Sequence, residues 1–241
     1  MNFKNISVEY HYLELPAPYS YTKKLLFTIS ENALLVDYSM EYTDREDFSI
    51  EELEDEGFGE NDNETWKGEL NKDWTESLKL LCSLKIGEKA SSANECIVKA
   101  DGIPIETYGQ EHRWDYFIQE ITQTIYETAE WETPLMIRYC KKESGKAPIQ
   151  TLQISFKNRN IIRDLSLPTE KTIGWDATQT LLELYYLQEF KAGEHSNKIP
   201  NQAGIFTDPG DGHWYNIDSS SSSLSKKQKE RLLQQLSELF G

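Results

Sequence analysis

Two carboxylates and an imidazole lie close together in segment 208–214, which reads DPGDGHW. Carboxylate oxygens suit hard cations such as Ca²⁺, and a carboxylate near an imidazole can act as a general acid or base. The segment lacks the further oxygens and the closing glutamate of an EF-hand loop. Proline, aspartate and glycine are also the usual residues of tight turns, in which aspartate accepts backbone hydrogen bonds. We therefore predict a turn, with Asp208, Asp211 and His213 as weak candidates for metal binding.

Cys96, His112 and Asp115 form a second group that could act as a nucleophile, a general base and an orienting carboxylate. Their spacing does not require them to meet, so we interpret Cys96 as a core residue and the other two as surface residues. The sequence contains no phosphate-binding loop, dinucleotide glycine fingerprint, GxSxG elbow or HExxH motif. It therefore predicts no catalytic residue and no cofactor.

Acidic residues are concentrated in segment 41–76, which contains 15 Asp or Glu and three Lys or Arg. This segment carries a net charge of −12, out of −16 for the whole chain. Such runs are commonly solvated surface. Acids set among aromatic residues also form docking surfaces, where the acids steer a basic protein and the aromatics anchor it. Both interpretations remain open, and the predicted partner-binding residues are Glu51, Glu54, Asp55, Phe58 and Trp66.

One short helix is fully delimited within the acidic segment. Ser49 is a good N-cap residue, and Glu52 stands at the position that completes a capping box. Gly57 suits the left-handed position that follows a helix, and Phe58 can reach back to Leu53 as in a Schellman motif. The pattern predicts an ordered helix over residues 49–56, which would display its charges on a rigid element.

The overall charge and the lack of a long hydrophobic segment restrict the partners and the compartment that we expect for the protein. Lys and Arg supply most of the affinity for phosphates, so 25 basic against 41 acidic residues argue against nucleic acid and anionic membranes as partners. No apolar run approaches the ~20 residues of a membrane-spanning helix. Residues 1–12 do not resemble a signal peptide, and three widely spaced cysteines suit free thiols. These features predict a soluble, cytoplasmic protein.

Strand periodicity dominates the beginning of the chain. Alternating apolar residues predict three strands, the last two forming a hairpin, at residues 6–12, 24–29 and 34–43. The polar segment 59–67 is predicted to be a loop, and a helix begins at Asn71 with Trp74 and Leu78 on one face. Segment 87–94 is small and polar, which is typical of a boundary.

The rest of the chain alternates between strand and helix patterns. An Asp101-Gly102 turn joins two predicted strands, and an amphipathic helix covers residues 113–130. Segment 176–187 is apolar nearly all round, which predicts a deeply buried helix. Segment 201–212 is predicted to be a turn-rich loop. The predicted strands of this part cover residues 95–99, 103–108, 135–141, 149–157, 161–165 and 214–217.

These elements predict an α+β fold with an antiparallel sheet, or sheets, packed by three to four helices. The chain would form one elongated domain or two intimately joined lobes. We expect an N-terminal lobe with the acidic surface at residues 1–90 and a C-terminal lobe at residues 91–218. Residues 219–241 would form a serine linker and an amphipathic helix that begins at Ser225 and docks on the body.

Two classes of function remain open. Localised acidity without a catalytic motif favours a non-catalytic protein that binds a basic protein, such as an inhibitor, an immunity-type protein or an adaptor. The alternative is a small hydrolase or metal-dependent enzyme with a site around Asp208, Asp211 and His213. A polar cleft that converges on His213 would favour the enzyme, whereas a broad acidic face without a deep cleft would favour the binding protein.

Overall fold

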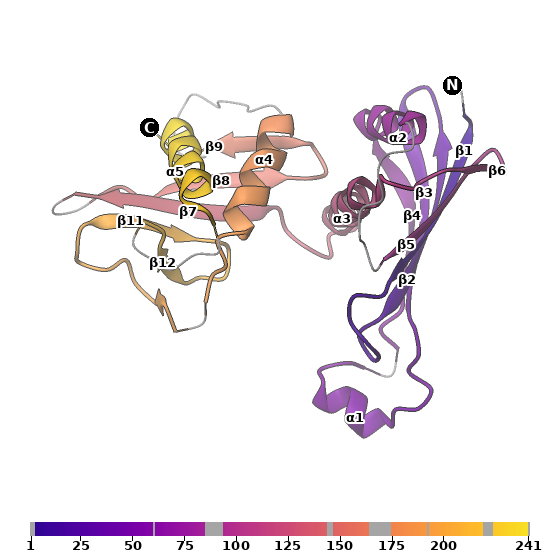
Figure 1. Ribbon diagram of the computed structural model, residues 1–241, viewed down its shortest axis with the longest axis horizontal. Helices are drawn as coiled ribbons and strands as arrows, with labels where there is room; N and C mark the ends of the chain where they lie inside the picture. Colours follow the sequence, from indigo (N-terminus) through magenta and orange to yellow (C-terminus); the bar gives the residue numbers. More distant parts are fainter. Residues whose placement is uncertain are drawn as a thin grey trace. The chain divides into compact units, whose positions relative to one another are not determined.

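The structure is a computed structural model that describes residues 3–59, 61–84, 94–143, 147–163, 175–191, 193–218 and 224–240. The chain divides into two compact units, Met1–Glu132 and Thr133–Gly241. Each unit contains one six-stranded sheet, all of whose paired strands are antiparallel, and the described residues form five helices (Figure 1). The predicted α+β class with antiparallel sheets is therefore confirmed.

The first sheet has the strand order β4-β3-β2-β1-β5-β6. Its strand β1 pairs with both β2 and β5, so the middle of the chain returns to the strand at its beginning. Because β5 and β6 belong to this sheet, the first unit continues to Glu132, whereas the sequence predicted a lobe boundary at residue 90. The strands are β1 (Asn5–Tyr12), β2 (Tyr21–Ile29), β3 (Ala33–Tyr42), β4 (Glu64–Asn71), β5 (Glu95–Ala100) and β6 (Ile103–Ile105).

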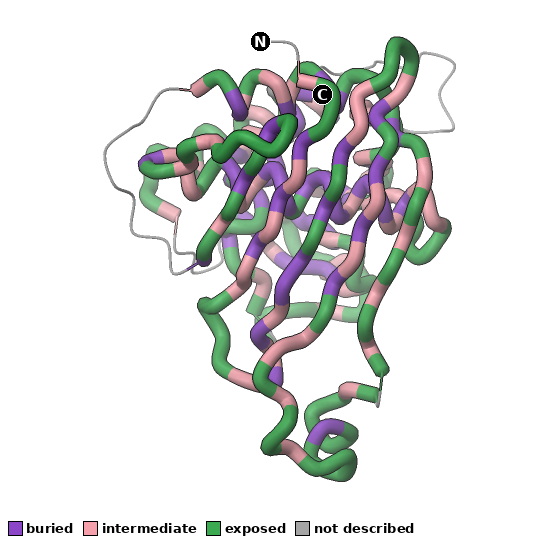
Figure 2. Tube along the Cα trace, turned by 90° about the vertical axis from the view of Figure 1, so that its right-hand side faces the viewer, coloured by how far each residue is buried: buried purple, intermediate pink, exposed green. Residues whose placement is uncertain are grey.

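Two helices, α2 (Asp73–Ser83) and α3 (Glu111–Thr128), cover one face of the first sheet (Figure 1). Trp74 of α2 and Ile121 of α3 are fully buried in the core of this unit. Along the strands, buried and exposed residues alternate, as Figure 2 shows. Burial of each large apolar side chain contributes about 1.5–3 kcal/mol, so the inward-facing set determines which face the helices cover.

The first half of strand β4 occupies residues that the sequence predicted to be a polar loop. Trp66 and Leu70 point to the helix-covered face, while Lys67 and Glu69 are exposed. β4 pairs antiparallel with β3, with Trp66 opposite Tyr38. The alternation is difficult to recognise in the sequence because charged residues and a glycine, which strands disfavour, fill half of the strand. Pairing with the strongly apolar β3 overrides that weak local preference.

The second sheet has the strand order β10-β12-β11-β7-β8-β9. The predicted turn-rich loop at residues 201–212 contains strand β11, which pairs with β7 and β12. Gly204 begins this strand and Gly210 follows it, which explains why the sequence suggested only turns. The strands are β7 (Leu135–Lys142), β8 (Gln150–Ser155), β9 (Asn160–Arg163), β10 (His195–Ser196), β11 (Gly204–Asp208) and β12 (Trp214–Asn216).

Helices α4 (Trp175–Tyr186) and α5 (Lys226–Phe240) pack against each other on the second sheet (Figure 1). Tyr186, at the end of α4, is 44% exposed, so this helix is not buried all round as the sequence suggested. In α5 the ring of Phe240 stacks on Tyr139 of β7, with the ring centroids 4.5 Å apart. Among the described residues, no helix combines the length and the hydropathy required of a membrane span. The predicted serine linker, residues 219–223, lies outside the described residues.

Shortening Leu236 to alanine should leave a cavity under α5. This side chain is 0% exposed and lies in the core of the second unit. We expect Leu236→Ala to lower the free energy of unfolding of that unit by about 2–5 kcal/mol, measured by urea unfolding. Ser237→Ala is the matched control, because Ser237 is exposed on the same helix. A stability of Leu236→Ala equal to that of the control would contradict the packing described here.

Candidate functional site

Helix α1 (Ile50–Asp55) carries exposed carboxylates at one end of the first unit (Figure 1). The Oγ of Ser49 accepts a hydrogen bond from the Glu52 N–H at 3.3 Å, and the Glu52 Oε2 accepts one from the Ser49 N–H at 2.8 Å. The predicted capping box is therefore present, and the hydrogen bonds from Ser49 lower the pKa of the Glu52 carboxyl. The partner-binding acids predicted on this helix, all exposed, are Glu51, Glu54 and Asp55.

The other end of α1 is a Schellman motif. The Phe58 N–H donates to the Leu53 carbonyl at 2.9 Å, and the Gly57 N–H donates to the Glu54 carbonyl at 3.0 Å. Gly57 has a φ of 86°, a left-handed conformation that glycine adopts without steric cost. The predicted ending is confirmed, so the acidic side chains extend from an ordered element.

Phe58 fastens α1 to the neighbouring strand ends. Its ring makes edge-to-face contacts with Tyr19 and Tyr42, with centroid distances of 5.4 and 5.2 Å. The Arg45 guanidinium lies 3.7 Å from the Tyr42 centroid and 4.0 Å from the Phe58 centroid. Its Nη1 also donates to Asp62 at 3.2 Å. We call Arg45 and the three residues that contact its guanidinium, Tyr42, Phe58 and Asp62, the Arg45 cluster. Phe58 thus packs the end of α1 against Tyr19 and Tyr42, and its contact with a partner stays a prediction.

Trp66 is half-buried and packs against the core of the first unit. A Cβ atom placed on Gly68 would lie only 2.3 Å from the Trp66 ring, so the indole requires a glycine at that position. The alternation of β4 directs the indole toward the helices. The structure therefore gives Trp66 a packing role, and its predicted role as an anchor for a partner is untested.

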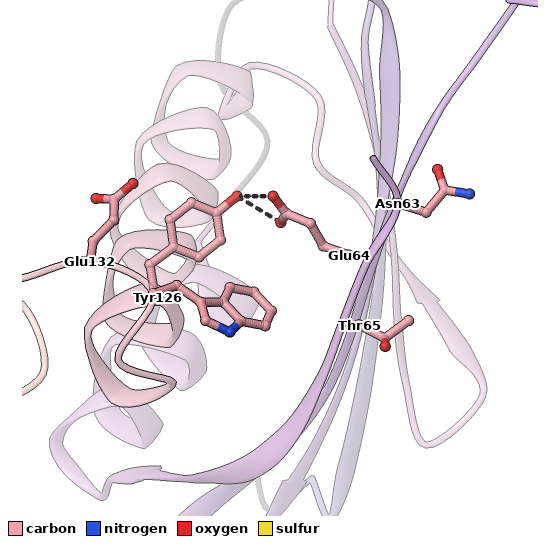
Figure 3. A pocket seen from close by; sticks show the side chains of 6 residues that line it. Asn63, Glu64, Thr65, Tyr126 and Glu132 are labelled. Carbon is pink, nitrogen blue, oxygen red and sulfur yellow. Dashed lines mark hydrogen bonds between the residues drawn. The ribbon is translucent and has the colours of Figure 1, made fainter. Parts of the chain in front are cut away.

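A pocket of about 480 Å³ lies between the end of α3 and the beginning of β4. Tyr126 extends from α3 toward Glu64 of β4, and its hydroxyl donates to both carboxylate oxygens at 2.8 and 2.7 Å (Figure 3). The Glu64 Oε2 also accepts a hydrogen bond from Tyr38 at 2.7 Å. Burial raises the pKa of both tyrosines, so both remain donors at neutral pH. The lining residues are Asn63, Glu64, Thr65, Tyr126, Trp131 and Glu132.

Lys23 brings a buried ammonium group to the same region. The residue is 7% exposed, and its Nζ donates to the Thr122 Oγ1 of α3 at 3.1 Å. Burial lowers the pKa of the Lys23 ammonium to about 8, and the Glu64 carboxylate opposes part of that shift. A hydrogen-bonded buried group of this kind is costly to desolvate. It therefore makes the stability of the first unit sensitive to pH.

Sequence reasoning missed this group of residues. Glu64 and Tyr126 are 62 positions apart, and the predicted loop concealed the strand that carries Glu64. One signal was present: in β2, Lys23 occupies an inward position between Tyr21 and Leu25, where a charged residue is unusual. A charged residue at a core position indicates a polar partner elsewhere in the fold.

Asp208 lies at the start of a tight turn, as the sequence of segment 208–214 predicts. The residue is fully buried, and its Oδ1 accepts hydrogen bonds from the Gly210 N–H at 2.8 Å and the Gly212 N–H at 3.1 Å. Its Oδ2 pairs with Arg138 of β7. The carboxylate therefore holds the chain between β11 and β12, and all of these partners are internal to the second unit.

Asp211 is exposed and His213 is half-buried in the same turn. The Asp211 Oδ1 accepts a hydrogen bond from the His213 N–H at 2.8 Å, and its Oδ2 accepts one from the Tyr215 hydroxyl at 2.7 Å. The His213 ring lies 4.3 Å from the ring of His195, centroid to centroid. In the part of the chain that the structure describes, no three His, Cys, Asp or Glu side chains are grouped so that they could hold a metal ion.

Cys96 lies on β5, where burial raises the pKa of its thiol and Asp115 raises it further. The thiolate is the nucleophilic form, so this environment disfavours reaction at neutral pH. Asp115 accepts a hydrogen bond from Tyr10, and His112 is exposed. Cys96 is half-buried and packs against the core of the first unit, while Asp115 is half-buried rather than exposed.

Comparison of the chain with protein-family models, curated proteins and solved structures finds no match. The function is therefore inferred from the residues and the geometry described above.

Replacing Lys23 by methionine should change how stability depends on pH. The unfolded chain holds the Lys23 proton up to its ordinary pKa of 10.5, whereas the folded protein releases it near 8. The parent should therefore gain stability as the pH rises from 8 toward 10.5. It should lose the same stability as the pH falls back from 10.5 through 8. Relative to Lys23→Met, we expect a gain of about 2 kcal/mol between about pH 7.5 and about pH 9.5, measured by denaturant unfolding.

Lys24→Met is the matched control for this experiment, because Lys24 is the exposed neighbour on the same strand. It should follow the pH profile of the parent. Ionisation of tyrosines in the unfolded chain, whose pKa is about 10, is common to the parent and both variants and therefore cancels in the comparison. Parallel profiles for the parent and Lys23→Met would show that the ammonium is not buried as described.

Proposed function

We propose that this chain is a non-catalytic binding protein that engages a basic protein through an acidic surface of its first unit. The distribution of charge carries the proposal. The first unit contains 11 Lys or Arg and 29 Asp or Glu, a net charge of −18, while the second contains 14 and 12, a net charge of +2. Together they account for the net charge of −16. The excess acidity therefore belongs to the first unit.

The acids of α1 are suited to steering a basic partner. Glu51, Glu54 and Asp55 are exposed on a helix that is fixed at both ends, by a capping box and by a Schellman motif. Charges on a preorganised element lose little conformational entropy when a partner binds. A strong field of one sign also raises the rate of encounter with a partner of the opposite charge. These properties fit an inhibitor, an immunity-type protein or an adaptor.

The alternative function, a small hydrolase or metal-dependent enzyme, receives no specific support from the described residues. Both carboxylates of its proposed site form turn hydrogen bonds within the second unit. The binding function therefore has the better support.

Reversing the charges of Glu51, Glu54 and Asp55 to lysine tests the proposal. The triple variant should fold like the parent, because exposed charges contribute little to stability. It should associate more slowly with the basic partner, and its on-rate should depend less on salt. The partner is the protein that the immobilised parent enriches from native cell extract, identified by mass spectrometry. Association rates are then measured by surface plasmon resonance at two salt concentrations.

A control variant reverses Glu143, Glu183 and Glu194, three exposed acids of the second unit. It changes the net charge by the same amount, so it separates the position of the charges from their number. We expect its on-rate to stay close to that of the parent. The proposal fails if the α1 variant retains the on-rate and salt dependence of the parent, or if the parent enriches no basic protein relative to that variant.

A further inference from the structure

The pocket beside Tyr126 contains the chemical groups that recognise an organic cation. Its lining includes two aromatic rings, Tyr126 and Trp131, and two carboxylates, Glu64 and Glu132. Aromatic faces attract cations, and carboxylates form charge-assisted hydrogen bonds with them. The Lys23 ammonium offsets part of the charge of Glu64. Glu132 and the net charge of −18 of the unit still favour a positive ligand.

The backbone at the end of α3 holds the two rings together. The Trp131 N–H donates to the Tyr126 carbonyl at 2.9 Å, and the Glu130 N–H donates to the Glu127 carbonyl at 3.4 Å. These bonds form a Schellman motif in which Glu130, with a φ of 60°, takes the position usually given to glycine. The motif turns the chain back over α3, and the ring centroids of Tyr126 and Trp131 lie 5.6 Å apart. The aromatic wall is therefore preorganised.

One carboxylate of the pocket is oriented as well. The Gln123 Nε2 donates to the Glu132 Oε2 at 2.6 Å, across the turn that ends α3. Figure 3 shows that Asn63 and Thr65 point away from Tyr126. Of these three neighbouring pocket residues, Glu64 is the one whose side chain points toward the Tyr126 ring. A ligand in the pocket would therefore meet aromatic rings and carboxylates rather than neutral amides.

The same unit already holds a guanidinium between groups of this kind. In the Arg45 cluster, the ring centroids of Tyr42 and Phe58 are 5.2 Å apart and the ring planes form an angle of 63°. The Tyr126–Trp131 pair has nearly the same geometry, with a distance of 5.6 Å and an angle of 53°. A carboxylate accompanies the ring pair in the Arg45 cluster, and two accompany it in the pocket. The Arg45 cluster thus indicates which ligand such a pair accommodates.

We propose that the Tyr126–Trp131 pocket receives an arginine side chain of the basic partner. A guanidinium suits the site better than an ammonium, because it is planar, stacks on aromatic rings and pairs with a carboxylate through two hydrogen bonds. This inference rests on the proposed function for the identity of the partner. It specifies arginine as the residue that the partner inserts. It also gives the partner a second contact site, formed by residues far from α1 in the sequence.

Titration of the full chain with N-acetyl-arginine amide tests the pocket without the partner. Binding is followed by NMR through the Trp131 indole N–H, which the variant Trp131→Phe assigns among the six tryptophans. We expect a saturable shift of this signal. The neutral isostere N-acetyl-citrulline amide should bind at least about fivefold more weakly, because it lacks the charge that the rings and carboxylates attract. N-acetyl-lysine amide should fall between the two.

Two variants test the lining directly. Trp131 is 48% exposed and Glu132 is exposed, so Trp131→Leu and Glu132→Gln should keep the fold. Each should weaken binding of the arginine derivative about threefold or more. The side-chain amide of Gln123 serves as the reporter where the indole is removed. The matched controls, an exposed ring and an exposed acid of the same unit, are Tyr108→Leu and Glu95→Gln, and both should bind like the parent.

The inference is overturned if the citrulline or lysine derivative binds as tightly as the arginine derivative, or if no saturable shift appears. It is also overturned if the two lining variants bind like the parent. None of these outcomes depends on the α1 acids, since those residues do not line the pocket. Capture of a basic protein that is lost in the α1 variant would uphold the proposed function even where the arginine pocket fails.

Discussion

The Glu64 carboxylate sets a constraint on which much of the first unit depends. The residue is half-buried, so its carboxylate needs donors to replace the water that it loses. Tyr38 of β3 and Tyr126 of α3 supply those donors, at 2.7 Å and at 2.7–2.8 Å. The three groups therefore fix the position of α3 along the sheet, and with it the turn that carries Trp131. A polar interaction thus specifies a packing that apolar contacts alone would leave less defined.

The first unit combines a strongly apolar interior with a net charge of −18. Self-repulsion of that size opposes compaction, so the acids must be placed where solvent screens them. Helix α1 meets this need by carrying Glu51, Glu54 and Asp55 at the end of the sheet. Local hydrogen bonds hold the helix in place, because a six-residue helix cannot form by propensity alone. The Arg45 cluster supplies the tertiary contact that joins it to the strands.

Features encoded by neighbouring residues could be predicted from the sequence, and features that join distant residues could not. Ser49, Glu52 and Gly57 define α1 within nine positions, and their hydrogen bonds are those that the pattern predicted. Glu64 and Tyr126 are 62 positions apart, and only the pairing of β4 brings them together. Trp131 was hidden for another reason: a glutamate stands where the turn after a helix usually has glycine.

The Arg45 cluster also determines whether trypsin can cleave the acidic segment after Arg45. Between Lys24 and Lys67 the chain contains a single basic residue, Arg45. Trypsin must take an arginine or lysine side chain into its specificity pocket, yet this guanidinium lies between two rings and its Nε donates to the Pro18 carbonyl at 2.9 Å. In the folded protein the peptide bond after Arg45 is therefore protected from cleavage by trypsin. The stretch between Lys24 and Lys67, which includes helix α1, would then survive limited tryptic digestion as one uninterrupted fragment.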